Sequence, residues 1–206
     1  VGSEMCIRDR LELKATSLTK YLKTLMDLDI LEREVPVTEE NPEKSKKGLY
    51  KIKDNYIRFW FAFVYPNLSF IESGNTRIVM NKIKKSFVSN QVAFVYEDIC
   101  RAEMWNMNAE DAWSFHFSKV GRYWDSQVEI DIAAVDPEGN NLILGECKYW
   151  QEQVGINILR ALEEKAAHVN WRKTDRKTWY VLFSANGFTP ELIELAEGRK
   201  DILLAQ

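Results

Sequence analysis

The stretch from Val128 to Trp150 constrains the fold more than any other part of the chain. Apolar side chains alternate with polar or small ones over residues 128–134, which is the two-residue repeat of a strand with one buried face. Residues 136–140 have turn chemistry, and a second apolar run follows at 142–144. The sequence therefore predicts two antiparallel strands joined by a turn, with Asp131 pointing away from the apolar side chains of the first strand.

The second of these strands ends in an acid and an amine. Glu146 and Lys148 share a side with the leucines at 142 and 144, and charged groups on an inner face must pair or meet a cation. Asp131 and Glu146, from adjacent strands, supply the hard oxygen ligands that Mg²⁺ prefers, and Lys148 could orient or deprotonate an attacking water. The pattern predicts Mg²⁺-dependent phosphodiester hydrolysis. The alternative is a surface ion pair between Glu146 and Lys148, worth roughly 0–1 kcal/mol.

These residues resemble the signature of a known superfamily. Asp131 followed by Glu146-Cys147-Lys148 is similar to the D…(D/E)-x-K motif of the PD-(D/E)XK nucleases, with Ile130 in the place of the proline. The resemblance implies a restriction-endonuclease-like α/β domain over residues 77–206, and the element order predicts a central mixed sheet. It also implies a further acidic residue from a preceding helix, for which Glu97 is well placed. The alternative for Glu97 is an ion pair with Arg101, four residues later.

Residues 11–68 have the pattern of a winged helix-turn-helix module with a linking aromatic helix. A helix beginning near Thr16 is followed by a strand at 32–37, a charged loop at 38–47 and a returning strand at 48–52. In such a module the wing contacts the DNA backbone, and its candidate residues are Lys44, Lys46 and Lys47. The alternative is a module used only for packing. The aromatic run at 56–65 is interpreted as a buried helix joining two domains rather than as a platform for stacked bases.

Other basic residues are candidates for nucleic-acid contacts. Arg122 lies in a predicted turn at 121–124, where it either contacts a phosphate or pairs with Glu129. Arg172, Lys173 and Arg176 form a cluster that either holds a nucleic-acid backbone or is a solvated loop.

Several short sequence segments, taken together, give a wider resemblance that extends from about Leu11 to the end of the chain. Together they look like the C-terminal half of prokaryotic P-loop ATPases whose tail is a domain of unknown function related to PD-(D/E)XK nucleases; the segments are Lys46–Ile52, Arg58–Phe61, Val64–Asn67, Gly121–Asp125, Glu129–Ile132 and Gly145–Tyr149. The likeness implies an upstream ATPase module, a winged helix and a nuclease-like domain. With the winged-helix and nuclease interpretations, DNA is the expected partner. No G-x-x-x-x-G-K-[ST] motif occurs in the 206 residues, so ATP is not expected to bind this chain. The alternative function is a catalytically silent DNA- or protein-binding module that serves the ATPase.

The composition of the chain argues against several other classes of protein. A net charge of -3 argues against a wholly basic nucleic-acid coat protein, and three distant cysteines argue against zinc or a disulfide framework. The sequence has no apolar run of membrane-spanning length and no signal peptide, so we expect a cytoplasmic protein without a membrane partner. Residues 1–10 fit no helix or strand pattern and are interpreted as a non-native remnant.

Overall fold

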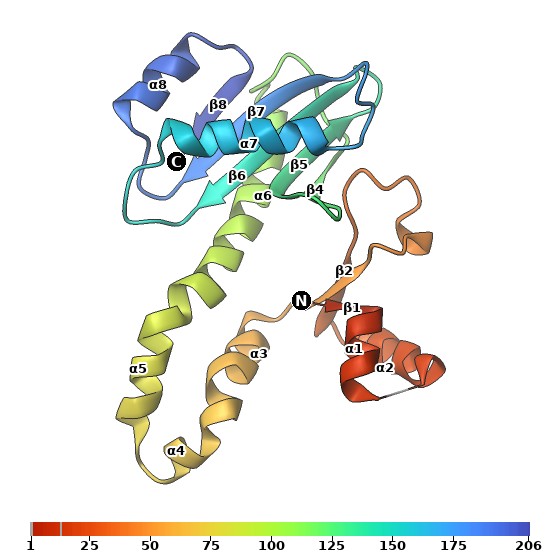
Figure 1. Cartoon of the computed structure of the whole chain (residues 1–206), viewed down its shortest axis with the longest axis vertical. Helices are drawn as coiled ribbons and strands as arrows, with labels where there is room; N and C mark the ends of the chain where they lie inside the picture. Colours follow the sequence, from red (N-terminus) through yellow and green to blue (C-terminus); the bar gives the residue numbers. More distant parts are fainter. Residues whose placement is uncertain (1, 13) are drawn as a thin grey trace. The chain divides into compact units, whose positions relative to one another are not determined.

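The computed structural model describes residues 2–12 and 14–206, and it divides into two compact units. The first unit runs to Val35 and resumes over Asn41–Val92. The second comprises Pro36–Glu40 and Ala93–Gln206. Figure 1 labels the elements of both. Within the described residues, none of the helices combines the length and the apolar character needed to cross a bilayer.

The first unit begins with a small antiparallel sheet and two helices. The strands are β1 (Gly2–Ser3), β2 (Leu31–Glu34) and β3 (Leu49–Ile52), in the order β1-β3-β2. The helices are α1 (Glu4–Leu11) and α2 (Ala15–Asp27), and the loop between β2 and β3 holds a 3₁₀ turn, η1 (Pro42–Lys44). Leu18 and Leu22 of α2 are buried against Tyr50 of β3. The predicted order of helix, strand, charged loop and strand is confirmed. The helix was predictable because its apolar residues recur at a spacing of three and four, which gives it one apolar face.

The expectation that the first ten residues form no regular element is wrong. Gly2 pairs with Tyr50, and Ser3 caps α1 by accepting a hydrogen bond from the Cys6 backbone N–H at 3.3 Å. A serine cap, an acid in the first turn and arginines in the last turn all favour a helix at this position. The non-native origin of the segment stays a prediction, and Val1 lies outside the described residues.

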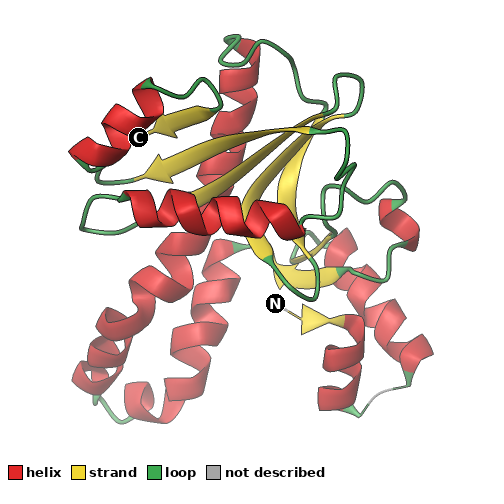
Figure 2. Cartoon of the chain, turned by 45° about the horizontal axis from the view of Figure 1, so that its top comes forward, coloured by secondary structure: helices red, strands yellow, loops and turns green. Residues whose placement is uncertain are grey.

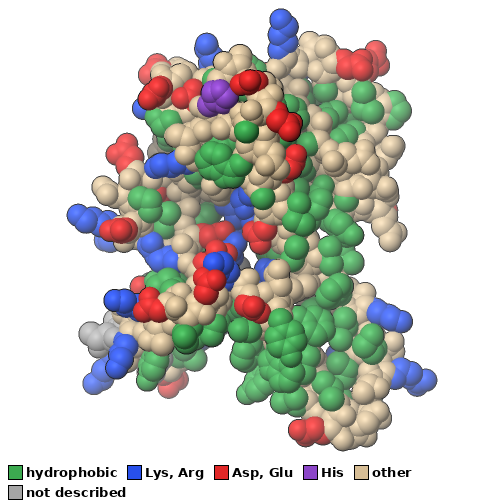
Figure 3. All heavy atoms as spheres, turned by 180° about the vertical axis from the view of Figure 1, so that it is seen from behind, with side chains coloured by type: hydrophobic (Ala, Val, Ile, Leu, Met, Phe, Trp, Pro, Cys, Tyr) green, Lys and Arg blue, Asp and Glu red, His purple; other side chains and the backbone are tan. Residues whose placement is uncertain are grey.

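A run of helical segments completes the first unit. They are α3 (Asn55–Phe59), the π-helix η2 (Trp60–Val64), the 3₁₀ turn η3 (Tyr65–Asn67), α4 (Leu68–Glu72), α5 (Thr76–Phe87) and the π-helix η4 (Val88–Val92). The aromatic run buries only one side, since Phe63 packs near Phe87 whereas Tyr56, Phe61 and Tyr65 are exposed. The expectation of a buried helix therefore holds for one side of the run only, and Figure 3 shows hydrophobic side chains gathered at the surface of these segments.

The second unit is a five-stranded mixed sheet with helices on both faces, which confirms the predicted α/β architecture. Its strands are β4 (Lys119–Trp124), β5 (Glu129–Asp136), β6 (Asn141–Lys148), β7 (Lys177–Ser184) and β8 (Ile202–Ala205), in sequential order. The first three are antiparallel and the last three are parallel. Helix α6 (Ala93–Ala109) covers one face, while α7 (Ile156–His168) and α8 (Pro190–Glu197) cover the other (Figure 2).

The predicted turn at residues 121–124 is wrong, because these residues form most of β4. Gly121 pairs with Ala133 and Tyr123 pairs with Ile130. Across this step β4 advances by two residues and β5 by three, so β5 carries one extra residue, which is the definition of a β-bulge. Asp131 lies within the bulge.

The bulge changes which side chains of β5 share a face. Ile130 packs in the hydrophobic layer beneath α7, whereas Ile132 and Ala134 pack in the layer beneath α6. The predicted alternation would have placed all three in one layer. Since helices cover both faces of the sheet, both sides of β5 are apolar, and the sequence alone does not show where the alternation breaks.

Candidate active site

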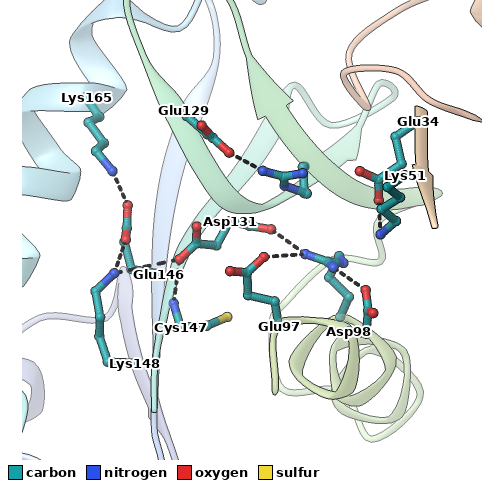
Figure 4. Close-up of polar contacts among 12 residues, drawn as sticks. Glu34, Lys51, Glu97, Asp98, Glu129, Asp131, Glu146, Cys147, Lys148 and Lys165 are labelled. Atoms are coloured by element: carbon teal, nitrogen blue, oxygen red, sulfur yellow. Dashed lines mark hydrogen bonds and ion pairs between the residues drawn. The ribbon is translucent and has the colours of Figure 1, made fainter. Parts of the chain in front are cut away.

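Asp131 lies where the pairing between β5 and β6 ends. The regular ladder stops at the pair Ile132 and Gly145. One step further, the Asp131 side-chain Oδ2 accepts a hydrogen bond from the Cys147 backbone N–H at 3.0 Å. The aspartate thus satisfies a backbone donor that the bulged strand leaves without a ladder partner, and its carboxylate is fixed beside the end of β6 (Figure 4).

Glu146 and Lys148 lie at the C-terminal end of β6, and their side chains approach Asp131. Lys148 Nζ lies 2.6 Å from Glu146 Oε2 and 3.8 Å from Asp131 Oδ2. All three side chains are at most about one-fifth exposed. The structure therefore brings together the two acids and the amine that the sequence singled out, whereas their catalytic and metal-binding roles stay predictions.

Glu97 approaches from α6, on the opposite side of Asp131 from Lys148 (Figure 4). Glu97 Oε2 lies 3.6 Å from Arg101 Nη1, and the same nitrogen donates to the Asp131 backbone carbonyl at 3.1 Å. Arg101 also pairs with Asp98. The two interpretations of Glu97 are therefore compatible, because the same carboxyl group contacts Arg101 and lies close enough to Asp131 for the two acids to affect each other's ionisation.

The four ionisable groups perturb one another. Burial, followed by the negative charge of Asp131, raises the pKa of Glu97 from 4.5 to about 7. Burial and the charge of Glu146 likewise raise the pKa of Asp131. Burial alone would raise the pKa of Glu146, but the ammonium groups of Lys148 and Lys165 together outweigh burial and lower that pKa. Glu146 in turn raises the pKa of Lys148 against the effect of burial. Perturbed pKa values of this kind are enriched at functional sites, and they also occur in structural ion-pair networks.

Lys165 is a member of the site that the sequence reasoning missed. It reaches from α7 and donates to Glu146 Oε1, so that Glu146 lies between two ammonium groups (Figure 4). A signal was present in the sequence. Lys165 follows Leu162 by three residues on the apolar face of α7, where a long charged side chain requires a partner.

The donor set suits Mg²⁺ better than a transition metal. Among the described residues, no group of three or more His, Cys, Asp and Glu side chains forms a ready metal-binding cluster. Mg²⁺ does not require one, because it commonly binds through one or two carboxylates together with waters and substrate phosphates. Asp131 and Glu146 meet that requirement, although a cation bound by Glu146 would compete with Lys148 and Lys165 for its oxygens.

The basic residues predicted to contact nucleic acid divide into two groups: arginines whose guanidinium groups are bound within the fold, and lysines that are exposed. Arg122 is 8% exposed and pairs with Glu129, as the second interpretation proposed. Arg172 donates to the Pro137 carbonyl and to Asn140 Oδ1, which ties it to the β5–β6 turn. Both guanidinium groups bind acceptors within the fold. Their contact with phosphates stays a prediction.

Arg176 turns inward and closes the C-terminal end of α7. Its guanidinium donates to the carbonyls of Val169 and Trp171 at 2.7 Å and to that of Ala166 at 2.6 Å. Lys173 of the same cluster is exposed. In the first unit, Lys44, Lys46 and Lys47 are exposed as well, in the charged loop between β2 and β3.

Comparison with known proteins gives a family and one relative without a described activity. Residues 60–178 match DUF234, described as archaeal and bacterial proteins of unknown function. The uncharacterized protein MJECL04 of Methanocaldococcus jannaschii is 37% identical over 146 residues. That match covers 71% of this chain and 32% of the relative, so the chain spans about a third of the length of that protein. No solved structure matches the chain.

Proposed function

Since the chain belongs to the DUF234 family of archaeal and bacterial proteins of unknown function, we propose its activity from its own site: Mg²⁺-dependent hydrolysis of DNA phosphodiester bonds. The observation that carries the proposal is the convergence of Asp131, Glu146 and Lys148, with the Lys148 ammonium 2.6 Å from one carboxylate and 3.8 Å from the other. Carboxylates from adjacent strands beside a fixed amine suit the binding and activation of a phosphodiester.

Each residue has a distinct role in this proposal. Asp131 and Glu146 would hold Mg²⁺, which when bound neutralises charge on the phosphate and lowers the pKa of water. Lys148, oriented by Glu146, donates to the phosphate or to the attacking water. Glu97 exchanges protons near neutral pH, because its pKa of about 7 is that of an effective general acid or base.

One observation favours a second candidate function, that of a catalytically silent module. Both oxygens of Glu146 contact an ammonium group, from Lys148 and from Lys165. A carboxylate neutralised in this way is satisfied without a metal, as in a purely structural ion network. The same fold would then bind DNA or a protein without cutting it.

The proposal extends to a longer protein. The relative is about three times as long as the matched region, which is compatible with the resemblance to P-loop ATPases that carry a winged helix and a nuclease-like domain at their C-terminal end. We propose that this chain supplies the DNA-directed part of such a protein, with the exposed lysines at 44, 46 and 47 contacting the DNA backbone.

The test is DNA cleavage with and without Mg²⁺. Supercoiled circular DNA is incubated with the wild-type chain, with Lys148→Ala and with Lys177→Ala. Lys177 is an exposed lysine on the neighbouring strand β7, and it pairs with Asn141 at the opposite end of β6, so it matches Lys148 in charge but lies away from the site.

We expect the wild type and Lys177→Ala to cut, and Lys148→Ala to lose about 100-fold or more in rate while still binding DNA. Binding without Mg²⁺-dependent cleavage, by this chain and by its full-length protein, would establish the silent module instead. Equal cleavage by the wild type and Lys148→Ala would show that the activity does not come from this site.

A further inference from the structure

Two exposed aromatic side chains follow directly after Lys148. Tyr149 is 43% exposed and Trp150 is 46% exposed, in the segment where the chain leaves β6. Large aromatic side chains in a soluble protein are more often covered, and an exposed pair beside a cluster of charged groups is suited to a ligand that has both a flat ring and a charge.

Both aromatic rings contact residues of the candidate active site or their direct neighbours. Lys148 Nζ lies over the Trp150 ring, 5.7 Å from its centroid, while the same nitrogen contacts Glu146. The Tyr149 ring lies 5.5 Å from the ring of Tyr96, which precedes Glu97 on α6. The two rings are therefore held close to the groups proposed to bind the phosphate.

We propose that Tyr149 and Trp150 stack on an unpaired base of the DNA strand being cut, so that the preferred substrate is single-stranded DNA or an unpaired segment. This inference rests on the proposed function. In a nucleotide the base and the phosphate are joined through one sugar, so a phosphate at Lys148 places a neighbouring base near Trp150. Bases inside a duplex stack on one another and do not offer their faces, whereas unpaired bases stack on aromatic side chains.

The chain provides a closely matched control. Trp105 is also 46% exposed, lies on α6 of the same unit and packs against Phe117, 5.0 Å between ring centroids. Trp105 follows Glu97 by eight residues, which is about 12 Å along a helix. Trp105→Ala therefore removes an equally exposed indole without changing the residues next to Lys148.

The first measurement is equilibrium binding of labelled single-stranded DNA and of the same sequence as a duplex, in EDTA so that no cleavage occurs. We expect Trp150→Ala to weaken single-strand binding by about 5- to 150-fold and duplex binding much less. Trp150→Phe keeps an aromatic ring and should retain most of the affinity, and Trp105→Ala should match the wild type. Unchanged single-strand affinity in Trp150→Ala, or an equal loss for both DNA forms, would overturn the proposal.

The second measurement separates this inference from the nuclease proposal. The same four proteins are assayed for Mg²⁺-dependent cleavage of the two DNA forms. Selective loss of single-strand binding in Trp150→Ala, with no cleavage by the wild type, supports the stacking inference and rejects the nuclease. Cleavage of both forms at equal rates by the wild type and Trp150→Ala supports the nuclease and rejects stacking.

Discussion

Replacing Glu97 by glutamine should change how the stability of the protein depends on pH. Burial, followed by the charge of Asp131, raises the pKa of Glu97 from 4.5 to about 7, so the folded protein holds this proton more tightly than the unfolded chain does. A raised pKa contributes stability that is complete below the unfolded pKa and is lost as the pH rises through the folded pKa. The Glu97 proton therefore stabilises the fold below about pH 4.5, and this contribution disappears between there and about pH 7.

The size of the effect follows from the two pKa values. The gap between 4.5 and about 7, at about 1.4 kcal/mol per pH unit, corresponds to about 3 kcal/mol. Glutamine approximates the shape of the protonated acid and does not titrate. The free energy of unfolding of the wild type, minus that of Glu97→Gln, should therefore fall by about 3 kcal/mol between about pH 4.5 and about pH 8.

The assay is urea unfolding of both proteins in EDTA across this pH range, followed by tryptophan fluorescence. Titrating groups that do not interact with Glu97 are shared by the two proteins and cancel in the difference. Glu103→Gln, an exposed position on the same helix, controls for the loss of one negative charge. A difference between wild type and Glu97→Gln that stays constant with pH would refute the argument that burial and Asp131 keep Glu97 protonated.

Three further changes test other contacts. Lys165→Met removes one of the two ammonium groups on Glu146, so we expect Mg²⁺ affinity to rise by about 10-fold in calorimetric titration; unchanged or weaker binding would mean that Glu146 is not a ligand. Gly145→Ala would place a Cβ 2.6 Å from Val181 Cγ1, and we expect a loss of about 1–3 kcal/mol in urea unfolding. Arg176→Gln removes donors from three carbonyls at the end of α7 and should cost about 1–3 kcal/mol by the same method, whereas an unaffected variant would show that water replaces the guanidinium.

The central strands and their connection were predictable because their patterns are local. The apolar run of β6, the apolar run of β7 and the turn chemistry at 136–140 are each contained within a few consecutive residues, so that none of them needs knowledge of distant partners. The same holds for α7 and α8, whose apolar spacing and proline at the first turn are readable along the chain. These elements fixed the mixed sheet and placed Glu146 and Lys148 at the end of a buried strand.

The position of Asp131 could not be derived in the same way. Its environment depends on the pairing of β5 with β4, and that pairing places one extra residue at the aspartate. The pattern around Gly121 and Arg122 resembles a turn, because glycine is one of the residues that are most common in turns. In the structure it is strand, and the Arg122 backbone carbonyl accepts a hydrogen bond from the Val37 N–H at 2.9 Å, which only the tertiary fold could show.

Side-chain contacts between residues far apart in the sequence could not be predicted either. Lys165 and Glu146 are 19 residues apart, and Arg176 meets the end of α7 only because the chain turns back toward the sheet. The clustering of basic residues around Arg176 predicted either a contact with a nucleic-acid backbone or a solvated loop. The structure places its guanidinium against backbone carbonyls, a role that leaves no pattern in the sequence.

The additional residue in β5 makes the candidate chemistry depend on an irregularity of the sheet. Deleting one residue at position 131 or 132 would return the strand to an uninterrupted two-residue repeat and would restore a continuous ladder. The regularised sheet would gain backbone hydrogen bonds, but the Asp131 carboxylate would be lost or displaced, and Lys148 would keep only its contact with Glu146. A redesign of this domain for greater rigidity should therefore keep the β-bulge at Asp131.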